Sequence, residues 1–136
     1  MHTTILICSA SLVILTILLA FWTSIQRGSS NVMAYGAPLE PESAMAKAQR
    51  AHGNAAEYAA LLIALFLVVG FAYADRDLGG LVTWTIIIVT VSRLIHAIGF
   101  LICKTLDKPH ILKAIGAFLT YSGCLLLSVL VLLQVH

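Results

Sequence analysis

The sequence predicts an all-α membrane protein, a four-transmembrane-helix bundle in which the whole chain, residues 1–136, forms a single domain. Charged residues make up only 10% of the chain, whereas a soluble domain carries roughly 25%, and the mean hydropathy is +0.99. Short polar stretches separate four long apolar segments, at residues 3–25, 44–73, 81–103 and 109–135. The formal net charge of +2 and the lack of a basic run argue against nucleic-acid binding.

The first two segments differ in length. Residues 3–25 carry no charge and are long enough to cross a bilayer. They lack a basic n-region and a small-residue cleavage site, so we interpret them as a retained helix and not a signal peptide. Residues 26–43 are rich in Gly, Ser and Pro and predict a loop that ends at Ser43, a candidate helix cap. The helix over 44–73 would be about 45 Å long against a hydrocarbon core of about 30 Å, so its first turns reach the headgroups.

The last two helices are predicted from their flanking turns. Residues 74–80 form a short polar turn before the helix over 81–103. Residues 104–108 form the next loop, and Pro109 suits the first turn of the final helix. The cysteines, Cys8, Cys103 and Cys124, have no metal-binding spacing, so we expect them to pack as small apolar residues and predict no metal site.

Basic residues predict the orientation in the membrane. They flank the first and third connections and are Arg27, Lys47, Arg50, Lys104, Lys108 and Lys113. The second connection has only Arg76. The positive-inside rule therefore predicts cytoplasmic loops at 26–43 and 104–108, with both termini outside.

Polar side chains interrupt the start of the second helix. At about 100° per residue, Arg50, Asn54 and Glu57 lie within about 60° of one another and form one stripe. His52 lies nearly opposite and Tyr58 to one side, so these two need a neighbouring helix or subunit to join the same site.

The third helix has a matching face formed by Arg93, His96 and Phe100. Glu57 and Arg93 both lie roughly 15 Å from the cytoplasmic ends of their helices. An arginine at mid-bilayer costs about 2.5–3.5 kcal/mol or more, so Arg93 should face protein and be paired, with Glu57 as the expected partner. Two interpretations follow: a structural salt bridge between helices, or a pocket for a small zwitterionic ligand whose carboxylates the guanidinium groups bind.

The blocks RAHGNAAEY (50–58) and RLIHAIGF (93–100) resemble the MAPEG family, the membrane-associated proteins of eicosanoid and glutathione metabolism. Residues 35–58 are most similar to its small bacterial members, which implies a bacterial inner-membrane protein. The resemblance also implies a homotrimer with glutathione sites between subunits, open to the cytosol. Its implied glutathione-binding residues are Arg50, His52, Asn54, Glu57, Tyr58, Arg93, His96 and Phe100.

The function that this resemblance implies is that of a glutathione transferase or peroxidase. A glutathione thiolate would attack a lipophilic electrophile or hydroperoxide from the bilayer, and Arg93, helped by a basic residue near 108–113, would stabilise the thiolate. The implied partners are glutathione as co-substrate, the lipophilic substrate, membrane lipids and further copies of the chain. Three features depart from the family pattern: Phe100 has no hydroxyl, Gly53 stands where some members have arginine, and helix four starts without the activating arginine.

Two other functions fit parts of the pattern. One is a non-catalytic glutathione- or lipid-binding scaffold of the same family. The other is a small four-helix multidrug exporter, but such exporters use a glutamate in the first helix, and residues 3–25 contain none.

Overall fold

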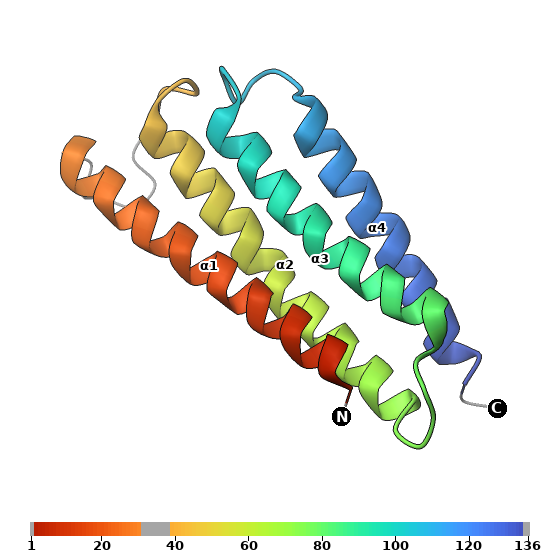
Figure 1. Cartoon of the computed structure of the whole chain (residues 1–136). Coiled ribbons are helices and arrows are strands. Elements are labelled where there is room, and N and C mark those ends of the chain that lie inside the picture. Colours follow the sequence, from red (N-terminus) through yellow and green to blue (C-terminus); the bar gives the residue numbers. More distant parts are fainter. Residues whose placement is uncertain (1, 31–38, 135–136) are drawn as a thin grey trace.

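A computed structural model describes residues 2–30 and 39–134. The described residues form four helices and no strand: α1 (Thr3–Ser30), α2 (Ala44–Ala72), α3 (Gly79–Ile102) and α4 (Ile111–Leu132). Consecutive helices run antiparallel, and both termini lie at one end of the bundle with the α2–α3 connection (Figure 1). Each helix is long and apolar enough to cross a membrane. The predicted all-α, four-helix architecture is therefore confirmed.

The first helix is longer than predicted. α1 continues to Ser30, whereas the sequence placed a loop from residue 26. Gly28 does not end the helix, because one glycine costs only about 1 kcal/mol. The hydroxyls of Ser29 and Ser30 donate to carbonyls four residues earlier, at 3.1 and 2.7 Å, and so do not compete for the helical amides. Residues 31–38 of the predicted loop lie outside the described residues.

The second and third helices agree closely with the prediction. Ser43 caps α2 as expected, since its side chain accepts a hydrogen bond from the Ala46 amide at 3.1 Å. α2 ends at Ala72, with Tyr73 as its C-cap. α3 begins at Gly79, two residues early, where a φ of 72° suits glycine.

The fourth helix starts later than predicted. Pro109 lies before the N-cap His110, which is extended, so Pro109 is not in the first turn of α4. Two hydrogen bonds fix the loop before α4. The Leu106 amide donates to the Pro41 carbonyl at 3.1 Å, and the Asp107 amide donates to the Thr105 hydroxyl. The predicted end at Val135 lies outside the described residues.

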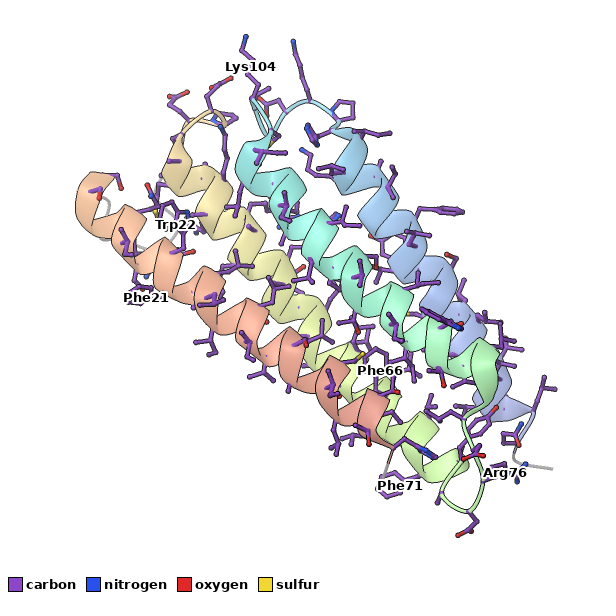
Figure 2. All side chains as sticks on the ribbon, viewed as in Figure 1. Phe21, Trp22, Phe66, Phe71, Arg76 and Lys104 are labelled. Carbon is purple, nitrogen blue, oxygen red and sulfur yellow. The ribbon has the colours of Figure 1, made fainter. Side chains whose placement is uncertain are left out.

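The buried core joins all four helices, and its largest fully buried side chain is Phe66 of α2 (Figure 2). Arg76 and Lys104 mark the opposite ends of the bundle (Figure 2). Many large apolar side chains remain exposed on the outer faces, as expected for helices that meet lipid. The core is formed mainly by Ile5, Leu12, Leu62, Phe66, Val69, Val82, Ile86, Val89 and Leu127.

α3 and α4 approach each other closely because of glycine. A Cβ at Gly116 would lie 2.6 Å from the His96 Cβ and 2.7 Å from the Ser92 carbonyl oxygen, so only glycine fits. One turn along α4, the Thr120 hydroxyl is fully buried and shares a hydrogen bond of 2.9 Å with the Ser92 hydroxyl. This contact sets which α4 residues face α3.

We expect Gly116→Ala to destabilise the protein by roughly 1–3 kcal/mol, because the added methyl group overlaps α3. Thermal unfolding in detergent would measure the loss. Gly28→Ala is the matched control, since a Cβ there meets nothing within 4 Å. Equal stability of the two variants would contradict the close packing of α3 and α4.

Candidate functional site

Arg93 is the buried cation of the bundle. It lies in α3 and is only 2% exposed. Its Nη2 donates hydrogen bonds to the backbone oxygen of Asn54, at 3.3 Å, and to the Asn54 side-chain oxygen. Its guanidinium carbon lies 4.4 Å from the centroid of the Tyr58 ring, which adds a cation–π contact. Both partners belong to α2, so the buried charge joins α2 to α3.

The partner expected from the sequence, Glu57, does not pair with Arg93. Among the described residues no carboxylate forms an ion pair with this guanidinium, and Glu57 is exposed on α2. Glu57 lies about 60° around the helix from Asn54. The rotation of α2 turns Asn54 and Tyr58 toward α3 and leaves Glu57 on the outer surface. The sequence could not specify this rotation, because Asn54 and Glu57 belong to the same stripe and are only about 60° apart.

A pair of tyrosines extends from Arg93 to the outer surface of α4. The Tyr58 hydroxyl donates to the Tyr121 hydroxyl at 3.3 Å, and the two ring centroids are 6.1 Å apart. Tyr121 is 53% exposed. It is not among the site residues predicted from the sequence. One signal was available: Tyr121 is ten residues into α4, about 15 Å from its start, which is the depth estimated for Arg93.

His96 and Phe100 form the second part of the site, together with Lys113 of α4. The His96 Nδ1 lies 2.7 Å from the Lys113 carbonyl oxygen, and the His96 ring meets Phe100 edge to face at 5.0 Å. The Lys113 ammonium lies 5.3 Å from the Phe100 ring centroid and donates to the Lys108 carbonyl at 3.1 Å. A basic residue near positions 108–113 was expected to join the site. Lys113 is such a residue, because it contacts His96 and Phe100 of the predicted α3 face.

Arg50 and Glu57 form the third part and lie on the outer surface. Both are exposed and line an open hollow of about 330 Å³. A Cβ at Gly53 would meet nothing within 4 Å, so this glycine keeps the floor of the hollow wide. The other lining residues are Leu39, Ala46, Gln49 and Leu106.

The structure thus brings the predicted residues together in groups. Asn54 and Tyr58 contact Arg93, while Arg50 and Glu57 share the exterior hollow. His52 is half-buried and makes no side-chain hydrogen bond with any described residue. An exposed guanidinium and an exposed carboxylate that line one hollow suit a zwitterionic ligand, since each binds the opposite charge.

We expect Asn54→Ala to destabilise the protein by roughly 2–3 kcal/mol, because Arg93 then loses its side-chain acceptor while remaining buried. Denaturant unfolding in detergent would measure the change. Glu57→Gln is the comparison, and it should leave stability close to wild type. The reverse order would instead support Glu57 as the partner of Arg93.

Comparison with known proteins identifies the family. A search against protein-family models matches the MAPEG family over residues 5–133. A search of curated protein sequences finds no match. The family match and the four candidate spans together make this an integral, multi-pass membrane protein. The chain therefore belongs to the MAPEG family.

Proposed function

We propose that this protein is a membrane-bound glutathione transferase or peroxidase that acts on lipophilic electrophiles or hydroperoxides. Its family supports a membrane protein of glutathione or eicosanoid metabolism. The observation that carries the proposal is the hollow in which Arg50 and Glu57 are both exposed. Glutathione has carboxylates for the guanidinium and an ammonium for the carboxylate. The hollow lies at the lysine-rich end, which we assign to the cytoplasm of a bacterium.

The ligand is proposed to bind between subunits of a homotrimer. Arg50 and Glu57 are exposed on the single chain, yet they belong to a helix that crosses the membrane. Glu57 is the deeper of the two, roughly 15 Å from the cytoplasmic end, where contact of a carboxylate with lipid would cost several kcal/mol. A neighbouring copy would cover this face and enclose the ligand. His52, which lies off the stripe, would then reach a site from another direction.

Arg93 is the proposed source of charge for the glutathione thiolate. Among the described residues, only its Nη2 has hydrogen-bond acceptors, so Nη1 and Nε remain as donors. A nearby cation lowers the pKa of a thiol and so favours the nucleophilic thiolate. Lys113, beside His96 and Phe100, adds a second positive charge near the cytoplasmic end. The thiolate would then attack a substrate that enters from the bilayer.

A non-catalytic glutathione-binding scaffold is the second candidate. The observation that favours it is the burial of Arg93, whose Nη2 is already bonded to Asn54 and whose guanidinium stacks on Tyr58. Saturable glutathione binding without turnover of any tested electrophile or hydroperoxide would select this candidate.

We expect the purified protein in detergent or lipid nanodiscs to bind glutathione saturably and to conjugate it to chlorodinitrobenzene. Isothermal titration calorimetry would measure binding, and absorbance of the conjugate would measure turnover. A folded protein that does neither would refute the proposed function.

Arg50→Gln should weaken glutathione binding roughly tenfold to hundredfold, since a hydrogen bond to a charged group contributes about 1.5–3 kcal/mol. The matched control is Arg76→Gln, which removes the same charge at the opposite end of the bundle (Figure 2). Equal weakening by both substitutions would indicate a general effect of net charge and not a contact with Arg50.

Arg93→Gln should abolish the ultraviolet thiolate signal of bound glutathione, because it removes the proposed cation. Arg93→Lys, which retains a charge, should keep part of the signal. Binding of glutathione sulfonate, whose anion needs no activation, would show that each variant is folded. Wild-type thiolate signals in a folded Arg93→Gln protein would remove Arg93 from the mechanism.

A further inference from the structure

The outer face of α4 contains an exposed phenol, that of Tyr121. Phe118, Tyr121 and Leu125 follow one another at helical spacing and are 70%, 53% and 68% exposed. Tyrosines of membrane proteins gather near the headgroups, but Tyr121 is about 15 Å into its helix. Its hydroxyl therefore lies at the depth where the proposed lipid-soluble substrates would arrive. The hydroxyls of the exposed Ser122 and Ser128 on the same helix donate to carbonyls of α4.

The direction of the tyrosine hydrogen bond leaves the Tyr121 proton available. Tyr58 is the donor and the Tyr121 oxygen is the acceptor, at 3.3 Å. A phenol both accepts and donates, so the proton of Tyr121 can be donated to a different oxygen on the exposed side.

Arg93 lies against the Tyr58 ring of the Tyr58–Tyr121 pair. Its positive charge would stabilise the negative charge left on Tyr121 when Tyr121 donates its proton. Its guanidinium carbon is 4.4 Å from the centroid of the Tyr58 ring. If Tyr121 gives up its proton, its oxygen becomes negative, and the Tyr58 hydroxyl already donates to that oxygen. Away from water, the Tyr58 hydrogen bond and the Arg93 charge act more strongly than they would in solution.

We propose that Tyr121 is the proton donor to the leaving oxygen when the substrate is a lipid-soluble hydroperoxide, with Tyr58 and Arg93 as positioning residues. The proposal rests on the proposed function above. The glutathione thiolate attacks the terminal oxygen; the S–O bond forms as the O–O bond breaks. The departing alkoxide takes the Tyr121 proton and leaves as an alcohol.

The remaining steps complete the reaction without another reductant. The first product on sulfur is glutathione sulfenic acid, which a second glutathione attacks to form the disulfide and release water. Tyr121 regains the proton that the first thiol lost to solvent. One hydroperoxide is reduced to alcohol and water, and two glutathiones are oxidised to one disulfide.

Displacement of chloride from an activated aromatic ring requires no proton donor for the leaving group. Chloride leaves as a stable anion and needs no proton. Tyr121 should therefore matter for peroxide reduction and much less for aromatic substitution, and this difference separates a proton donor from a residue that only packs.

The test compares two substrates in the full-length protein: cumene hydroperoxide and chlorodinitrobenzene, each with glutathione. For Tyr121→Phe we expect the ratio of peroxidase to substitution turnover to fall roughly 10²-fold or more, the usual contribution of general acid catalysis. Tyr58→Phe should lower the same ratio by less. Tyr73→Phe, the same change at the buried C-cap of α2 and far from Arg93, should keep the wild-type ratio.

The other outcomes are equally informative. If Tyr121→Phe keeps its peroxidase activity, or loses both activities equally, Tyr121 is not the proton donor. A wild-type protein that substitutes chloride but does not reduce the hydroperoxide would overturn this inference and leave the proposed function intact. A wild-type protein that binds no glutathione and turns over neither substrate would remove both.

Discussion

Burial of one guanidinium group, that of Arg93, determines how α2 packs against α3. Arg93 cannot face lipid without a cost of several kcal/mol, and burial without hydrogen-bond acceptors would cost more. α2 meets both needs from two consecutive turns, with Asn54 as acceptor and Tyr58 as an aromatic surface. The rotation of α2 follows from these contacts, and so does the position of its outward-facing residues.

The close packing of α3 on α4 positions the α4 residues of the site relative to Arg93. Gly116 lets the two helices approach, and the Ser92–Thr120 hydrogen bond holds their register. The result places Tyr121 beside Tyr58 and Lys113 beside His96. The buried arginine is thereby linked to the α4 surface, while Lys113 places a second cation near the end of the bundle that carries Lys104.

Two charged side chains of the single chain, those of Arg50 and Glu57, lack the surroundings that charges on a membrane-spanning helix require. Arg50 and Glu57 are exposed although they lie on a membrane-spanning helix. In a soluble protein, water would satisfy them. Here a ligand and a second copy of the chain are the proposed partners, which explains why polar residues are retained on an outer face. In the proposed function, binding at a subunit boundary and entry of substrate from the bilayer would both follow from this one arrangement.

The sequence by itself determined the architecture, because apolar segments of membrane-spanning length separated by polar turns have few other solutions. It also predicted that Arg93 would be buried against α2, since hydrocarbon excludes a lone charge. Only the tertiary structure decided that Asn54, and not Glu57, accepts its hydrogen bonds. It likewise brought Tyr121 to the site. Both depend on helix rotation, which side-chain packing sets within a few tens of degrees and which the spacing of residues along one helix does not specify.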